Sequence, residues 1–169
     1  MLASTLALDY ARFGRPADAH AMLYHAQEVQ SGETSSPGGP LSCAPERALS
    51  YWADAYLVLS DPGRAMEMAD RSVEISQGKS ERTRNLGTER MTMLHVVRAH
   101  IDTGALDGAA EALAPVLETP LEARATPLLL QLGQIASRIP AAFQGGGEGR
   151  AIRETISAFS DESRPHTER

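Results

Sequence analysis

The feature that most constrains the fold is a six-residue motif that occurs three times. Each copy begins with Gly or Ser, continues through a short polar turn and ends in Ala. The copies are residues 14–19 (GRPADA), 60–65 (SDPGRA) and 104–109 (GALDGA), and their final alanines are 46 and 44 residues apart. Recurrence at this spacing predicts repeated supersecondary units, each of which needs a neighbour to bury its apolar face.

Small, apolar and aromatic residues recur at fixed distances from these anchor alanines. They stand twelve residues upstream (Ala7, Ala53, Val97), nine upstream (Tyr10, Tyr56, His100), four downstream (Leu23, Ala69, Leu113) and seven downstream (Ala26, Ser72, Val116). Each side of the motif therefore has the spacing of one helical face, which predicts a helical hairpin. In the middle copy, Asp61 is expected to cap the second helix and Pro62 to occupy its first turn.

The remaining helices are expected on both sides of this central hairpin. We predict helices over residues 2–12, 89–103, 107–118 and 150–159, a helix that Pro16 opens and whose buried side lies over 19–29, and a further helix that starts at Thr119 or at Thr126. The third hairpin is expected to bury Met93, Val96, Val97 and His100, and Pro115 should kink its second helix. Residues 31–44 read as a loop and residues 160–169 as a disordered tail, so the predicted domain covers residues 1–159.

These motifs resemble the tetratricopeptide repeat, with a small residue and an aromatic on the first helix, a Gly-Asp-like turn and a small-large-small series on the second. The third copy departs from it, because His100 replaces the aromatic and Val97 the small residue. The usual repeat has about 34 residues, so the units here are longer. The resemblance implies an all-α tetratricopeptide-like α-solenoid of three to four helix pairs.

The arginine- and alanine-rich character of residues 2–159 is similar to the C-terminal half of actinobacterial helix-turn-helix regulators of the xenobiotic-response-element type. That resemblance implies the interaction part of a transcriptional regulator without its DNA-binding domain. A free-standing tetratricopeptide adaptor unrelated to transcription is the alternative. The first hairpin begins at the start of the sequence, so its outer side is expected either to face water harmlessly or to meet an upstream domain or a second subunit in a homodimer.

Charge and composition argue against several partners. The formal net charge is −6, whereas non-specific nucleic-acid affinity is built from clustered Lys and Arg, so direct nucleic-acid binding is not expected. Cys43 is the single cysteine, and no apolar run is long enough to cross a bilayer. We therefore expect a cytoplasmic protein.

No residue pattern points to catalysis, so we do not expect an enzyme or a cofactor. Residues 145–149 are glycine-rich, but the Lys and Ser or Thr of a phosphate loop do not follow. His20 and His25, like His95 and His100, are five residues apart, which places them about 140° apart on a helix and makes a shared metal improbable.

The remaining candidate is a binding surface. In tetratricopeptide arrays the first helices line a groove, and the resemblance places eight residues of this chain there. They are Arg47, Ser50, Asp54 and Leu57 in the second repeat, and Met91, Leu94, Arg98 and Ile101 in the third. Such a surface would hold a peptide or a partner helix, with arginines pairing carboxylates.

Overall fold

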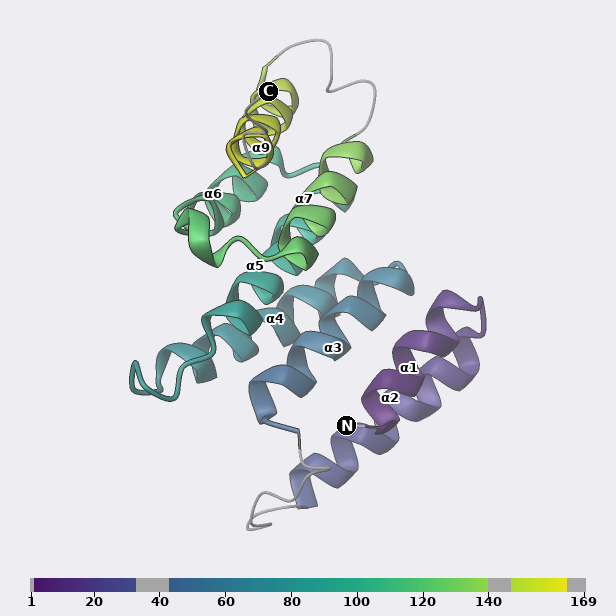
Figure 1. Ribbon diagram of the computed structural model, residues 1–169. Coiled ribbons are helices and arrows are strands. Elements are labelled where there is room, and N and C mark those ends of the chain that lie inside the picture. Colours follow the sequence, from purple (N-terminus) through teal and green to yellow (C-terminus); the bar gives the residue numbers. More distant parts are fainter. Residues whose placement is uncertain (1, 33–42, 140–146, 164–169) are drawn as a thin grey trace. The chain divides into compact units, whose positions relative to one another are not determined.

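The structure is a computed structural model that describes residues 2–32, 43–139 and 147–163. These residues form helices and no strand, which confirms the predicted all-α class (Figure 1). The elements are α1 (Leu2–Arg12), α2 (Pro16–Gly32), α3 (Pro45–Val58), α4 (Pro62–Gln77), α5 (Leu86–Asp102), α6 (Leu106–Leu117), the short 3-10 helix η1 (Leu121–Ala123), α7 (Thr126–Arg138) and α9 (Glu148–Glu162).

The chain divides into two compact units, residues 1–95 and 96–169, with the boundary inside α5. The first unit contains two antiparallel hairpins, α1–α2 and α3–α4, and α1 packs on α3 (Figure 1). Trp52 on α3 donates a hydrogen bond from Nε1 to Ser4 Oγ on α1 at 3.0 Å. Fully buried alanines, Ala7 and Ala53 among them, allow these helices to approach closely.

The three predicted turns have the same backbone hydrogen bonding. In each turn, the backbone N–H of the residue after the left-handed residue donates to the carbonyl oxygen five residues earlier, which is the hydrogen bond of a Schellman motif. The three bonds are Arg15 N to Tyr10 O at 2.9 Å, Asp61 N to Tyr56 O at 2.9 Å and Ala105 N to His100 O at 2.8 Å. The stopping residues share a left-handed conformation, with φ of 69° at Gly14, 60° at Ser60 and 78° at Gly104.

The buried positions around the turns also repeat. The anchors Ala19, Ala65 and Ala109 are each 0% exposed, and the residues four and seven positions after them are all buried. Asp61 caps α4 as predicted, because its side chain accepts a hydrogen bond from Arg64 N at 3.1 Å. The repeat alignment read from the sequence therefore corresponds to equivalent local environments.

The second unit has a core of aliphatic side chains from α6, α7 and α9. One face of α7 is buried, with Leu132 at 0% exposed, and so is the face of α9 that carries Ile152, Ile156 and Phe159. Arg124 ties the segment before α7 to α9. Its Nη1 donates to Phe159 O at 3.2 Å, its guanidinium lies 3.8 Å from the centre of the Phe159 ring, and its Nε donates to Thr119 O at 2.9 Å.

Several predicted boundaries require correction. α5 begins at Leu86 and not at 89, because Asn85 Oδ1 accepts from Thr88 N at 3.0 Å and caps the helix earlier. α7 begins at Thr126, and the Thr119 alternative leads only to the 3-10 turn η1. α9 continues to Glu162, so residues 160–162, which were expected in the disordered tail, are helical. Most of the predicted loop (33–42) and tail (164–169) lies outside the described residues.

The buried pattern of α5 is also broader than predicted. Val97 is fully buried, but Met93, Val96 and His100 are only partly so. A second stripe, Thr92, His95 and Ala99 at i, i+3 and i+7, is buried instead. The prediction missed this stripe because two of its residues are polar.

Candidate functional site

The eight candidate groove residues differ widely in exposure. Arg47 is exposed, Asp54, Met91 and Arg98 are half-buried, and the other four are buried. Ser50 is 8% exposed, Leu57 3%, Leu94 0% and Ile101 3%. These four side chains have almost no surface to present to a ligand. All eight lie on α3 or α5. The unit boundary separates Arg98 and Ile101 from the other six, so each group is described by itself.

Two of the accessible candidates already take part in ion pairs. Arg12 Nη2 lies 3.0 Å from Asp54 Oδ2 and joins α1 to α3. In the second unit, Arg98 Nε lies 3.6 Å from Asp102 Oδ2, and Arg138 approaches the same carboxylate at 3.8 Å. Arg47 differs from them in having an exposed side chain, which makes it the best-placed cation of the predicted set.

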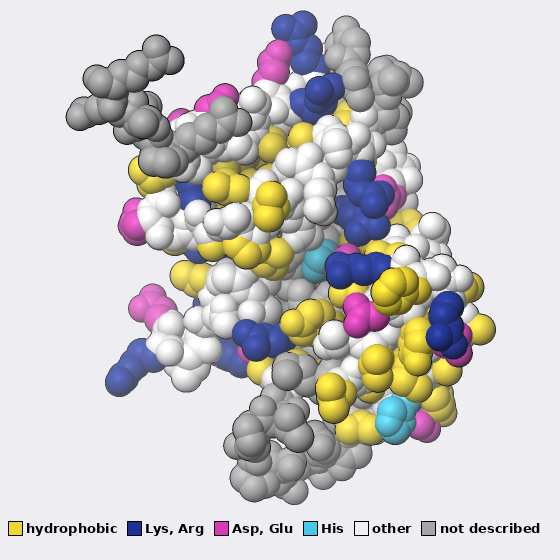
Figure 2. Space-filling model, turned by 45° about the vertical axis from the view of Figure 1, so that its right-hand side comes forward, with side chains coloured by type: hydrophobic (Ala, Val, Ile, Leu, Met, Phe, Trp, Pro, Cys, Tyr) yellow, Lys and Arg dark blue, Asp and Glu magenta, His cyan; other side chains and the backbone are white. Residues whose placement is uncertain are grey.

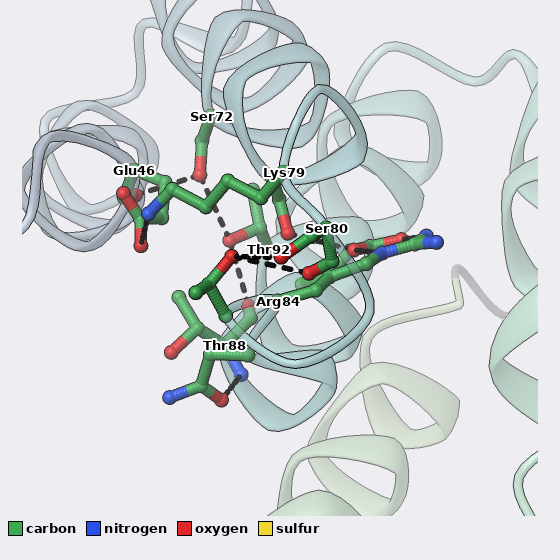
Figure 3. A network of polar contacts seen from close by, with 11 residues as sticks. Glu46, Ser72, Lys79, Ser80, Arg84, Thr88 and Thr92 are labelled. Atoms are coloured by element: carbon green, nitrogen blue, oxygen red, sulfur yellow. Dashed lines mark hydrogen bonds and ion pairs between the residues drawn. The ribbon is translucent and has the colours of Figure 1, made fainter.

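A buried polar network that the sequence analysis did not predict joins α3, α4 and α5 in the first unit (Figure 3). Glu46, at the start of α3, is 5% exposed. Its backbone carbonyl accepts a hydrogen bond from Ser72 Oγ at 2.7 Å, and its carboxylate Oε1 accepts from Lys79 Nζ at 2.5 Å. Ser72 Oγ also lies 3.4 Å from Thr92 Oγ1, so it links α3 to α4 and α4 to α5.

Glu89, at the start of α5, is the second buried carboxylate of this network. It is 6% exposed and receives two hydrogen bonds from Arg84, one of them from Nε at 2.7 Å, and a third from Ser76 Oγ at 2.7 Å. The Arg84 guanidinium, helped by the Ser76 hydroxyl, lowers the pKa of Glu89 against the opposing effect of burial. Glu89 is therefore a carboxylate held in its charged form.

The geometry of the network suits positioning of helices. Lys79 and Arg84 belong to the α4–α5 connection, and each neutralises the buried carboxylate at the start of a different helix. Burying a charge is tolerated when it is paired and hydrogen-bonded. One residue of the sequence pointed to a buried polar contact here, because Ser72 stands on the apolar stripe of α4 where a tetratricopeptide repeat has alanine.

The histidines and the cysteine among the described residues show no grouping typical of a metal site. Within residues 2–32, 43–139 and 147–163, no cluster of three or more His, Cys, Asp or Glu is arranged to hold a metal ion. His100 packs its ring against Gly108, and His95 is buried. Burial raises the pKa of the Cys43 thiol, which lowers its reactivity at neutral pH.

Comparisons with known proteins leave this geometry as the basis for any functional conclusion. No family model matches the chain, and no significant match occurs among curated proteins or solved structures. Among the described helices, none combines the length and the apolar character that a membrane span requires.

Proposed function

We propose that this chain is a tetratricopeptide-like protein- or peptide-binding module. The observation that carries the proposal is a turn that recurs three times, over Tyr10–Ala19, Tyr56–Ala65 and His100–Ala109. Each turn has an equivalent backbone hydrogen bond, a left-handed residue at the equivalent position and a buried alanine at its end. Repeated helical hairpins of this kind stack into scaffolds whose side chains recognise extended peptides or helices.

Arg47 is the residue on which recognition is expected to depend. It lies in the first turn of α3 with an exposed side chain, and its planar guanidinium suits bidentate pairing with a carboxylate. Asp54, two turns further along α3, and Met91 on α5 add an acidic and an apolar group at half-buried positions. An exposed arginine at this position favours a peptide that carries an acidic residue.

A random peptide library selected on the folded chain tests the proposal. Enriched peptides should contain Asp or Glu, and fluorescence anisotropy should show that Arg47→Ala weakens their binding by roughly 10-fold or more, the equivalent of one charge-assisted hydrogen bond. Arg71→Ala, at an exposed arginine on the second helix of the same hairpin, is the matched control and should bind normally. Equal effects of the two substitutions, or no enrichment, would refute the proposal.

The link to transcription is a separate part of the proposal and rests on the resemblance of residues 2–159 to regulator repeat regions. It predicts an in-frame helix-turn-helix in the coding sequence upstream of residue 1. Reading that sequence decides between a regulatory module and an adaptor, and it does so independently of the peptide experiment.

A further inference from the structure

Lys79 is the single lysine of the chain, and it pairs with a buried carboxylate. The sequence has 16 basic residues, so the basic side chains spread over the face in Figure 2 are, Lys79 aside, all arginines. Lys79 directly follows Gly78, the C-cap of α4, and its side chain extends to the start of α3 (Figure 3). There its Nζ lies 2.5 Å from Oε1 of Glu46.

Glu46 depends on this contact more than Glu89 depends on any of its own. The second carboxylate oxygen of Glu46, Oε2, is buried and accepts no hydrogen bond from the described residues. Glu89 instead accepts three hydrogen bonds, two from Arg84 and one from Ser76. A buried carboxylate that loses its cation is strongly unfavourable. The charge of Lys79 therefore stabilises the buried position of Glu46 at the start of α3.

Lys79 and Arg84 differ in what can be done to their charges. An ammonium group that loses a proton becomes a nucleophile, whereas the guanidinium of Arg84 stays protonated. The Lys79 side chain is 30% exposed, and its flexible four-carbon stem lets Nζ turn from Glu46 to solvent. Acylation of Nζ would convert the ammonium into a neutral amide and remove the cation of the ion pair.

We propose that Lys79 is an acylation site, at which an acyl phosphate modifies Nζ and thereby loosens the start of α3. The neutral Nζ attacks the acyl carbon, and the C–N bond forms as the C–O bond to phosphate breaks. Phosphate leaves with the electron pair, and the proton lost from the ammonium passes to water. The backbone carbonyl of Glu46 keeps its hydrogen bond from Ser72 Oγ at 2.7 Å. The loosening is therefore expected in the first turns of α3 and not throughout the hairpin.

This site is independent of the proposed peptide binding, although the two meet on α3. Arg47 directly follows Glu46, so a loosened first turn would also displace the guanidinium on which recognition is expected to depend. Stability and amide exchange report on the modification without any peptide. Failure of either proposal would therefore leave the other untouched.

Treatment of the full chain with acetyl phosphate tests the proposal. The amines of the chain are its α-amine and Lys79 Nζ, and peptide mapping by mass spectrometry measures acetylation at each. Acetylation of Lys79 should raise the equilibrium constant for unfolding in urea by about 10-fold or more, less than for a fully buried pair because the lysine is partly exposed. Hydrogen exchange should become faster over residues 46–51 of the acetylated species, which its mass distinguishes from the unmodified one.

Two variants separate the charge effect from acetylation of the α-amine. Lys79→Arg keeps the cation but offers no amine there, so acetyl phosphate should leave its stability unchanged. Glu46→Gln removes the buried charge, so acetylation of its Lys79 should change its stability little. Circular dichroism shows whether each variant folds, and either one alone suffices as the control. A Lys79 that stays unmodified while the α-amine reacts, an acetylated chain as stable as the untreated one, or an equal loss in Glu46→Gln would overturn the proposal.

Discussion

Ser60 holds a backbone conformation that the other two turns assign to glycine. Its φ of 60° matches the 69° of Gly14 and the 78° of Gly104. A residue with a Cβ in this left-handed region is strained by roughly 1–2 kcal/mol. Glycine avoids that strain, but it loses about 0.4–1 kcal/mol more conformational entropy on folding. We therefore expect Ser60→Gly to stabilise the chain by about 0.5–1 kcal/mol.

A matched pair of alanine substitutions isolates the backbone effect within the second unit. An added Cβ at Gly104 or at Gly133 meets no atom within 4 Å, so neither substitution causes a clash. Gly133 lies inside α7, where alanine should stabilise by about 1 kcal/mol. At Gly104 the left-handed φ should make the same substitution destabilising, by about 0.5–1 kcal/mol.

Urea unfolding followed by circular dichroism measures all three variants. The midpoint should rise for Ser60→Gly and Gly133→Ala and fall for Gly104→Ala, with the slope of the transition unchanged. Shifts of the same sign at Gly104 and Gly133 would refute the backbone argument. A lower midpoint for Ser60→Gly would show that the serine side chain stabilises the turn by more than its conformation costs.

Two further predictions concern buried contacts. Glu89→Gln should destabilise the fold by about 1–3 kcal/mol at pH 7. Because Arg84 holds the pKa of Glu89 below its usual value, the ion pair stabilises the fold fully above the unfolded-state pKa near 4.3. That stabilisation is lost as the pH falls through the folded-state pKa of Glu89. Urea titrations should therefore show the gap from the unmodified chain narrowing below about pH 4, and a constant gap would contradict the ion-pair explanation. Gly108→Ala should lower the free energy of unfolding by about 1–3 kcal/mol, because an added Cβ would lie 2.7 Å from the His100 ring. Thermal unfolding measures this, and a Gly108→Ala variant as stable as Gly133→Ala would show that the ring moves freely.

The turns could be predicted because their determinants are local. Gly14 and Gly104 supply the left-handed residue, and Asp61 caps α4 within three residues of its own position. The anchor alanines followed from the recurrence alone, because an interface between closely approaching helices has room for little else. The helices of the described residues were therefore readable, and the boundary errors fell at the starts of α5 and α7, where two caps compete, and at the end of α9.

The buried polar network could not be predicted in the same way. Lys79 pairs with Glu46 across 33 residues, and no local pattern relates the two. Single-sequence periodicity treats Ser, Thr and Glu as solvent-facing, whereas Thr92 is fully buried here and Glu89 nearly so. A polar residue on an otherwise apolar stripe, such as Ser72, was the signal available, and its meaning depended on partners from other helices.

The candidate groove exposes a different limit of sequence reasoning. The resemblance assigned positions by register, and register says which side of a helix a residue occupies but not how near the next helix lies. Leu57, Leu94 and Ile101 are large apolar residues at those positions, and all are buried. Arg47, which is charged and one turn into α3, remains exposed. The assignment of a binding residue therefore needs both its register and its chemistry.

Alanine-rich contacts and polar contacts have different roles in the first unit. Small side chains let α1 approach α3, but a smooth alanine surface tolerates sliding along the helix axis. Directional bonds remove that freedom: Trp52 reaches Ser4 at 3.0 Å, and Arg12 reaches Asp54 at 3.0 Å. A shift by one turn, about 5.4 Å, would break both. The register between α1 and α3 is thus selected by a few polar atoms.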